Sequence, residues 1–246
     1  MPARDSLVIL PTFNEAANLG RLVERVLRAG PFDVLVVDDH SPDGTGSLAD
    51  ALVEAHPSRV AVLHRPSKLG LGTAYLAGFR HALTRNYARV FEMDADFSHD
   101  PACLPALRAA LDEADLVLGS RYVAGGATYG WPVWRRALSQ GGSLYAATML
   151  GLPFHDLTGG FKGFRARVLE ALDLDSIVSN GYAFQIEVTH RAHQLGFRIV
   201  ELPIAFTDRR VGQSKMSRRI VLEALVMVWR LRLESQRRLS IGEVPR

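Results

Sequence analysis

Two aspartates, Asp94 and Asp96, lie one residue apart where an apolar stretch over residues 90–93 ends. The stretch is typical of a buried strand, so the pair is expected at a strand's carboxyl end, where ligands of open α/β sheets bind. Adjacent carboxylates repel each other unless a cation or a proton lies between them. A hard divalent ion that also coordinates substrate phosphates suits this position, so we predict a metal–diphosphate site. Capping of the next helix is the alternative, but Asp100, directly before Pro101, fits that role better.

The elements that would position this pair alternate between strands and helices. Strands are expected over residues 6–10, 33–37, 59–63, 90–93 and 115–119. Helices are expected between them, the first capped by Asn14 and the others over residues 47–55, 74–83 and 101–111. This rhythm predicts right-handed crossovers, and therefore an α/β fold whose mostly parallel sheet is covered by helices on both faces.

The pattern loosens after Tyr122. Residues 123–132 are rich in glycine and aromatic residues and are expected to form a mobile loop beside the site. Further elements are expected as a helix over 133–150 interrupted at Gly141-Gly142, a strand over 157–164, a helix over 182–195 and a strand over 197–204. Arg135 opposes the helix dipole at the start of the first of these helices. It either binds an anion there or is simply exposed to solvent.

Other nucleotide and metal sites have little support. Pro11 follows the first strand where a dinucleotide-binding domain would have its glycine-rich turn, and the chain has no phosphate-binding loop of the nucleoside triphosphatase type. Gly70 and Gly72 are interpreted as turn residues in preference to a phosphate cradle. His190 and His193 lack a third soft ligand nearby and are interpreted as packing or surface residues.

The composition is that of a globular protein. With 246 residues and 48% hydrophobic content, the chain is able to bury a full core. Cys103 is the only cysteine, so no intramolecular disulfide is expected and a reducing compartment is favoured. We find no export signal and no apolar run near the ~20 residues that span a bilayer. The expected location is the cytoplasm, peripheral on the cytosolic face of a membrane.

The net charge of +3 is unevenly distributed. From Arg209 onward the chain has ten Lys/Arg and three Asp/Glu, which leaves 19 basic and 23 acidic residues before that point. Aromatic residues are not interleaved with this basic region, so anionic lipid is favoured over nucleic acid as its partner. A helix over residues 217–237 carries a narrow charged stripe and is otherwise apolar. It either packs in the domain or, as we favour, lies in a membrane interface or docks a partner.

Seven motifs together carry a family resemblance. They are Pro11–Glu15, Val36–Asp39 with Ser41–Asp43, Met93–Asp96, Gly119–Tyr122, Asp156–Gly159, Gly181–Glu187, and Asp208-Arg209 with Ser214-Lys215. They resemble family 2 glycosyltransferases and, more narrowly, the polyprenyl-phosphate (dolichyl-phosphate) mannose synthases. The resemblance covers residues 6–216 and implies a GT-A catalytic domain over 1–216, with an amphipathic basic helix and tail over 217–246.

The resemblance also implies roles for individual residues. The nucleotide sugar would be bound by Pro11, Phe13, Glu15, Val37, Asp39, Asp94, Ala95, Asp96, Ser98, Arg121, Arg209 and Lys215. Mg²⁺ or Mn²⁺ would be held by Asp94, Asp96 and Ser98, although some relatives have glutamine at the last position. The acceptor phosphate would be bound by Arg121, Arg135 and Ser139, and turnover would depend on Asp96, Arg121 and Arg135.

The implied reaction moves mannose from GDP-mannose to a polyprenyl monophosphate at a membrane surface. An integral membrane protein is a further expected partner. A phosphate monoester is largely ionised at neutral pH, so the acceptor needs orienting cations more than a general base. We expect a single displacement with inversion. The alternatives are UDP-glucose or another sugar nucleotide as donor, a non-catalytic nucleotide-sugar-binding module, and a nucleotidyltransferase.

Overall fold

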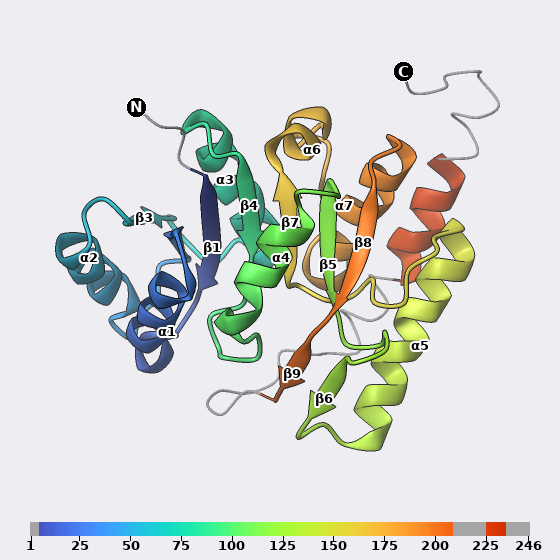
Figure 1. Cartoon of the computed structure of the whole chain (residues 1–246), viewed down its shortest axis with the longest axis horizontal. Coiled ribbons are helices and arrows are strands. Elements are labelled where there is room, and N and C mark those ends of the chain that lie inside the picture. The colour runs from blue at the N-terminus through green and yellow to red at the C-terminus, as the bar shows by residue number, and fades with distance from the viewer. Residues whose placement is uncertain (1–4, 209–224, 235–246) are drawn as a thin grey trace.

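A computed structural model describes residues 5–208 and 225–234 (Figure 1). Its centre is a seven-stranded sheet with the order β3-β2-β1-β4-β7-β5-β8. The strands are β1 (Ser6–Thr12), β2 (Phe32–Asp38), β3 (Val60–His64), β4 (Arg89–Glu92), β5 (Leu116–Ser120), β7 (Lys162–Arg165) and β8 (Ile199–Pro203). Only β7 runs antiparallel to its neighbours in this sheet. The predicted α/β class with a mostly parallel sheet is confirmed.

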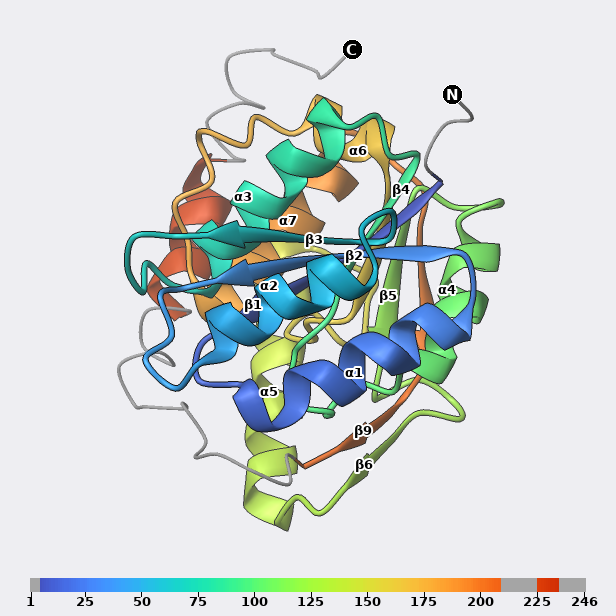
Figure 2. The same ribbon diagram turned by 90° about the vertical axis from the view of Figure 1, so that its left-hand side faces the viewer.

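Helices cover both faces of the sheet, as Figure 2 shows. They are α1 (Ala16–Ala29), α2 (Thr45–Ala55), α3 (Leu71–Thr84), the short 3₁₀ helix η1 (Pro101–Cys103), α4 (Leu104–Ala110), α5 (Val133–Leu150), α6 (Ala166–Ala171) and α7 (Gly181–Gln194). Side chains of β1 alternate between the two cores because successive residues of a strand point to opposite faces. Leu7 and Ile9 pack with α3, α6 and α7, whereas Val8 and Leu10 pack with α1, α2 and α4.

A second, two-stranded sheet lies beside the first half of α5 (Figure 1). It pairs β6 (Ala127–Tyr129) in parallel with β9 (Ala205–Thr207). The region over 123–132, predicted as a mobile loop, therefore contains a short strand. This strand was not predicted because its partner lies far along the chain, where no local pattern reveals it.

Three further predictions about local structure need correction. Gly141-Gly142 does not interrupt α5, which continues to Leu150. The strand expected over 157–164 is confined to Lys162–Arg165. Asn14 does not cap α1, because it adopts a left-handed backbone (φ 62°) and Glu15 is the capping position.

The start of α1 is instead satisfied by side chains at the start of α2 and in the loop before it. The Glu15 N–H donates to Thr45 Oγ1 (2.9 Å) and the Ala16 N–H to Asp43 Oδ2 (3.1 Å). By contrast, the predicted cap at Asp100 is confirmed, since its side chain accepts from the Ala102 N–H (3.0 Å). Side chains distant in sequence can thus replace a local cap.

The helical segment over 225–234 packs along α5. Val228 and Leu231 are buried there together with Ala146. The rest of the helix expected over 217–237 lies outside the described residues, as do Arg209 and Lys215. Among the residues that the structure describes, no helix combines the length and hydropathy needed to cross a bilayer.

Candidate active site

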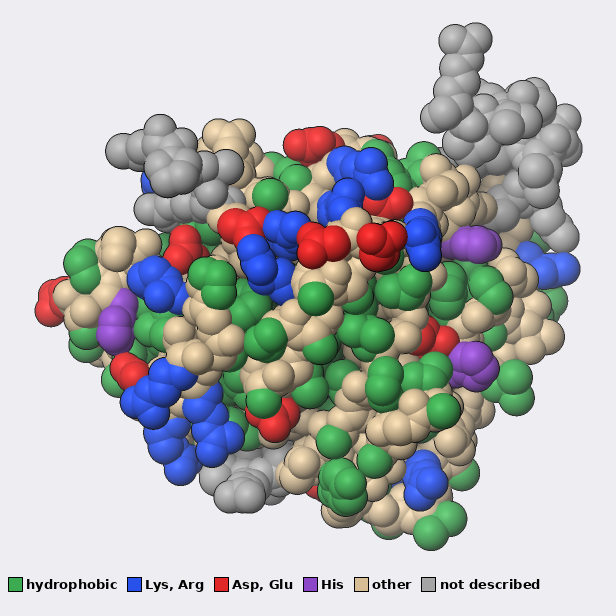
Figure 3. Space-filling model, viewed as in Figure 1, with side chains coloured by type: hydrophobic (Ala, Val, Ile, Leu, Met, Phe, Trp, Pro, Cys, Tyr) green, Lys and Arg blue, Asp and Glu red, His purple; other side chains and the backbone are tan. Residues whose placement is uncertain are grey.

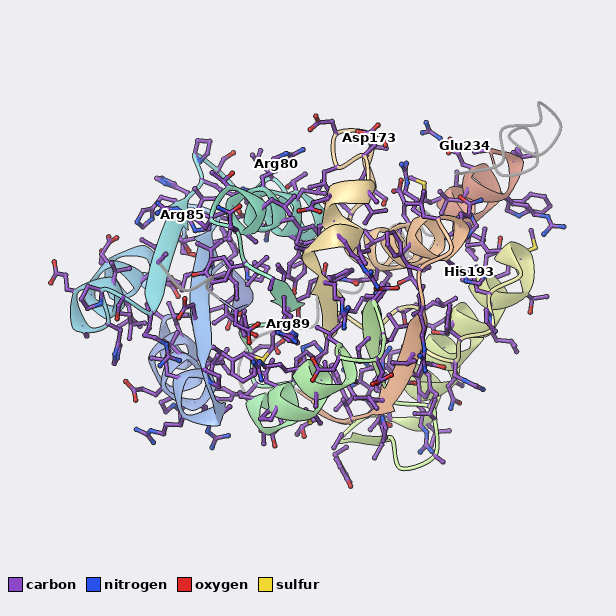
Figure 4. The ribbon with its side chains drawn as sticks, turned by 45° about the horizontal axis from the view of Figure 1, so that its top comes forward. Arg80, Arg85, Arg89, Asp173, His193 and Glu234 are labelled. Carbon is purple, nitrogen blue, oxygen red and sulfur yellow. The ribbon has the colours of Figure 1, made fainter. Side chains whose placement is uncertain are left out.

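The candidate site residues meet at one edge of the sheet. Because β1, β2, β4 and β5 all run in the same direction, the residues that follow them come together at their carboxyl ends. The opposite edge carries structural ion pairs instead. Arg89, labelled in Figure 4 at the start of β4, pairs there with Asp5 and with Asp112 (2.6 Å).

The acid pair lies directly after β4, as predicted. Asp94 is half-buried, and its carboxylate accepts a long hydrogen bond from the Tyr75 hydroxyl (3.4 Å). Burial, followed by the charge of Asp94, raises the pKa of Tyr75 well above its usual value, so the phenol stays protonated as a donor. Asp96 is buried and accepts from the Ser98 N–H (3.0 Å), which fixes the turn between them.

The donor atoms at this turn suit a hard cation. The turn offers the carboxylates of Asp94 and Asp96 and, as a third oxygen, the Ser98 hydroxyl. This hydroxyl is buried and has no hydrogen-bond partner among the residues that the structure describes. Oxygen ligands are those that Mg²⁺ and Mn²⁺ prefer. Over residues 5–208 and 225–234, no group of three or more His, Cys, Asp or Glu is arranged to hold a metal. A cation at this turn would therefore need further oxygens from substrate and water.

Two buried groups of opposite charge lie below the acid pair. Glu92 and Lys162 face each other across the β4–β7 ladder, and both are almost completely buried. The Lys162 ammonium donates to the Gln185 carbonyl (2.6 Å) and to Thr189 Oγ1 (2.8 Å), which ties β7 to α7. Burial raises the pKa of Glu92 and lowers that of Lys162, while each charge opposes the shift of the other. Asp94 thus follows a strand whose last residue lies opposite a buried cation.

Several of the residues assigned to the nucleotide line the ends of β1 and β2. Asp39 is buried and pairs with Arg65 (3.1 Å), whose guanidinium also donates to Thr73 Oγ1 (2.8 Å). Burial raises the pKa of Asp39 despite the cation beside it. The ammonium of Lys68 lies 3.9 Å from the centre of the Phe13 ring. Arg65 and Lys68 are basic residues that sequence reasoning did not assign to this side.

The remaining nucleotide candidates differ in exposure. Pro11 and Glu15 are half-buried at the edge of the sheet. The Glu15 carboxylate accepts from the Asn18 side chain (2.9 Å). Val37 and Ala95 are buried in the two hydrophobic cores, so only their backbone is available to a ligand.

Arg121 follows β5 and forms a buried bidentate ion pair with Asp156. Its Nε and Nη2 lie 2.7 and 2.6 Å from the two carboxylate oxygens, and Nη2 also donates to Thr158 Oγ1 (2.9 Å). The side chains of Arg121 and Asp156 are 4% and 0% exposed. Burial opposes the charge, yet Asp156 raises the pKa of the guanidinium, which stays ionised.

Arg135, in the first turn of α5, points inward. Its Nη1 lies 2.9 Å from Asp208 Oδ1, and its side chain is only 12% exposed, so simple solvent exposure does not explain it. Its guanidinium lies 4.4 Å from the centre of the Trp131 ring, and that of Arg121 lies 5.3 Å from the same centre. Two cations therefore flank one indole ring.

Ser139 lies one helical turn after Arg135 and faces the Tyr122 phenol, whose pKa is raised chiefly by burial. His99 was missed by sequence reasoning. Its Nδ1 accepts from the Asp94 N–H (3.2 Å), and its ring packs against Phe161 and Phe206 (centroids 5.0 and 5.3 Å). Phe206 in turn contacts Trp131 (5.1 Å), so packed rings connect the acid pair with the two arginines.

Comparison with known proteins identifies relatives over nearly the whole chain. The family described as "Glycosyl transferase family 2" matches residues 7–173. A polyprenol monophosphomannose synthase of Mycolicibacterium smegmatis is 51% identical over 236 residues, which are 94% of this chain and 89% of that protein. An undecaprenyl-phosphate mannosyltransferase of Micrococcus luteus is 53% identical over 225 residues, which are 91% and 92% of the two chains.

Solved structures share the fold at low identity. Mannosyltransferase PcManGT from Pyrobaculum calidifontis, in complex with GDP-Man and Mn²⁺, superposes with a TM-score of 0.63 at 21% identity, over 93% of this chain and 64% of that one. Glucosyl-3-phosphoglycerate synthase from Mycobacterium tuberculosis, in complex with Mn²⁺, UDP-Glc and phosphoglyceric acid, gives a TM-score of 0.70 at 17% identity, over 93% and 80% of the chains. The predicted GT-A fold is confirmed.

Proposed function

The chain belongs to glycosyl transferase family 2, and on this premise we propose that it transfers mannose from GDP-mannose to a polyprenyl (dolichyl) monophosphate, releasing GDP. Both relatives above are named for mannose transfer to such lipids. The observation that carries the proposal is the meeting of an acid pair and two arginines at one sheet edge. Asp156 and Asp208 form ion pairs with Arg121 and Arg135, respectively. Carboxylates engaged in this way suit an acceptor that needs no general base.

Asp94, Asp96 and the Ser98 hydroxyl would hold Mg²⁺ or Mn²⁺. When bound, the cation supplies positive charge to the diphosphate leaving group. Asp96 is held by the Ser98 N–H and Asp94 by Tyr75 and His99, so the carboxylates are oriented before the donor arrives. Arg209 and Lys215, assigned from the motif alone, would contact the same diphosphate.

Arg135 would orient the acceptor phosphate, with Ser139 beside it on the next turn. Arg121 would contribute positive charge toward the same phosphate. Its Nε and Nη2 already donate to Asp156. A phosphate oxygen held by these groups attacks the anomeric carbon as the bond to the diphosphate breaks, which inverts the configuration. No covalent enzyme intermediate is formed. Phe13, Glu15 and Asp39, with the backbone of Pro11, Val37 and Ala95, would bind the nucleotide.

The domain arrangement and location are part of the same proposal. Residues 1–216 would form the catalytic domain, and the amphipathic helix and basic tail over 217–246 would associate with the cytosolic face of a membrane or with an integral membrane protein there. A lipid acceptor favours a peripheral position on that face. The described part of the helix supports this by leaving Trp229 54% exposed.

The decisive experiment compares donors. Purified protein is incubated with tritiated GDP-mannose or UDP-glucose, a short polyprenyl phosphate and Mg²⁺ or Mn²⁺, and the lipid-extractable label is counted. We expect product from GDP-mannose that is lost with EDTA. Label transferred only from UDP-glucose would make the protein a glucosyltransferase, and nucleotide binding without product would support a binding module. Release of pyrophosphate in place of GDP would indicate a nucleotidyltransferase.

A further inference from the structure

Asp156 lies in the loop that joins α5 to β7 over residues 151–161, which we call the Asp156 loop. Asp156 Oδ2 accepts from the N–H and the Nε of Arg121 (2.9 and 2.7 Å), and Oδ1 accepts from its Nη2 (2.6 Å). A guanidinium is rigid and planar, so a bidentate contact along one edge sets the direction of the remaining Nη1. The position of the Asp156 loop therefore sets the direction in which Arg121 presents its charge.

Glu201 holds the Asp156 loop by its backbone. It lies in β8, opposite Leu118 of β5. Its Oε1 accepts from the Asp156 N–H (2.9 Å), and its Oε2 accepts from the His155 N–H (2.9 Å) and lies 2.8 Å from His155 Nδ1. The Glu201 side chain is only 7% exposed. One largely buried carboxylate thus fixes two consecutive peptide units.

The second half of the Asp156 loop is held by weaker bonds. Ser143 Oγ, in α5, accepts from the Leu157 N–H (3.3 Å) and lies 3.3 Å from Thr158 Oγ1. These contacts are neutral and longer than those that Glu201 makes. Hydrogen bonds to an ionised group are roughly twice as strong as neutral ones. We therefore expect Glu201 to contribute more than Ser143 to the position of Asp156.

Glu201 differs from the acidic residues on the nearby surface. In Figure 3, a band of both charge signs crosses the upper part of the molecule, over the start of β8, and the surface below it is mainly hydrophobic and uncharged. Glu113 pairs at 4.0 Å with Arg198, which precedes β8, and the Glu113 side chain is 82% exposed. Because an exposed pair of this kind contributes little to stability, Glu113 provides a matched control for a change from Glu to Gln.

We propose that Glu201 is a positioning residue for the acceptor phosphate. It acts through the backbone at residues 155–156 on the Asp156 carboxylate and, through that carboxylate, on Arg121. The inference rests on the proposed function, in which Arg121 directs its charge toward the acceptor, and deepens it with a residue outside the seven motifs. Loss of a purely structural carboxylate would weaken the binding of both substrates, whereas loss of a positioning one weakens that of the acceptor phosphate alone.

Isothermal titration of the full-length protein with two probes tests the inference. Glu201→Gln keeps the size of the side chain but replaces one acceptor oxygen by an NH₂ donor, so one of the two N–H groups loses its acceptor. We expect the Kd for farnesyl phosphate, a short polyprenyl phosphate, to rise about tenfold, while the Kd for GDP with Mn²⁺ stays within about twofold. Ser143→Ala should raise the first Kd by a smaller factor, and Glu113→Gln should change neither. Farnesol, which lacks the phosphate, should bind wild type and Glu201→Gln equally.

A double-mutant cycle with Asp156→Asn tests the route of action. If Glu201 acts through Asp156, Glu201→Gln should raise the Kd for farnesyl phosphate by no more than about twofold in the Asp156→Asn background. Full additivity of the two changes would overturn the inference, as would an unchanged Kd for farnesyl phosphate or an equal rise for GDP. Circular dichroism checks the folding of each variant. If Glu201→Gln does not fold, Glu201→Asp, which keeps both acceptor oxygens on a shorter side chain, should show the same selective effect by a smaller factor.

Turnover of GDP-mannose with farnesyl phosphate is measured in parallel. Binding of farnesyl phosphate that depends on Glu201, without mannosyl product from the wild type, would defeat the proposed function but not the positioning role. Product from the wild type, together with equal affinity of wild type and Glu201→Gln for farnesyl phosphate, would defeat the positioning role but not the proposed function.

Discussion

Lys162→Met removes the ammonium group that faces Glu92 across the β4–β7 ladder. Both side chains are almost fully buried, and removing one of two buried opposite charges costs up to about 3–5 kcal/mol because the other charge is left uncompensated. The two hydrogen bonds to Gln185 and Thr189 disappear as well. We therefore expect the free energy of unfolding to fall by about 4 kcal/mol at pH 8, measured by urea denaturation followed by circular dichroism.

The pH dependence and a second variant make this test specific. Without Lys162, burial raises the pKa of folded Glu92 further, while unfolded Glu92 ionises normally. Folded wild-type Glu92 has a pKa of about 7, so the penalty of the variant relative to the wild type grows as the pH rises above that value. The loss of stability in Lys162→Met should therefore be smaller at pH 5 than at pH 8. Glu92→Gln combined with Lys162→Met removes both charges and should recover about 2 kcal/mol or more at pH 8. The reasoning fails if Lys162→Met costs under about 1 kcal/mol at pH 8, or if the double variant is no more stable than the single one.

Three further predictions concern the site and its surroundings. Asp96→Asn should abolish Mn²⁺ binding detected by electron paramagnetic resonance and lower kcat by about 10³-fold or more; unchanged Mn²⁺ affinity would place the cation elsewhere. Arg135→Gln should raise KM for the acceptor about 10–100-fold with little change in KM for the donor, since a charged hydrogen bond to phosphate contributes about 1.5–3 kcal/mol; equal effects on both substrates would argue against its assignment. Burial lowers the pKa of His190 to about 4, so unfolded protein takes up a proton as the pH falls from 6.5 to 4 and folded protein does not. Wild-type stability should lose roughly 3 kcal/mol over that interval, and His190→Leu, compared by the same denaturation, should lack that loss.

The acid pair was predictable because the alternation of strands and helices places Asp94 at a carboxyl end whatever the order of the sheet. The antiparallel insertion of β7 was not, since nothing in its four residues distinguishes an antiparallel strand from a parallel one. Glu92 and Lys162 did leave a signal. Each is a charged residue within an otherwise buried strand, and burial of such a charge requires a partner.

The partners of the arginines were beyond sequence reasoning alone. Asp156 is 35 residues from Arg121, and Asp208 is 73 residues from Arg135. Their pairing depends on loops brought together by the sheet. The motif residues were recognisable individually, but the bidentate geometry that occupies Arg121 and the inward direction of Arg135 depend on tertiary packing. The aromatic contacts of His99 arise in the same way.

The parallel pairing of β6 with β9 joins the stretch before α5 to the stretch that ends at Asp208. The Asp208 N–H donates to the Tyr129 carbonyl (2.9 Å), and its carboxylate holds Arg135. Arg209, assigned to the sugar nucleotide, is the next residue along the chain. If Asp208 shifts when the donor binds, either its ion pair with Arg135 breaks or Arg135, which we assign to the acceptor phosphate, moves with it. By linkage, each substrate should then alter the affinity for the other by the same factor, through Asp208 and Arg135 as well as through their direct contact.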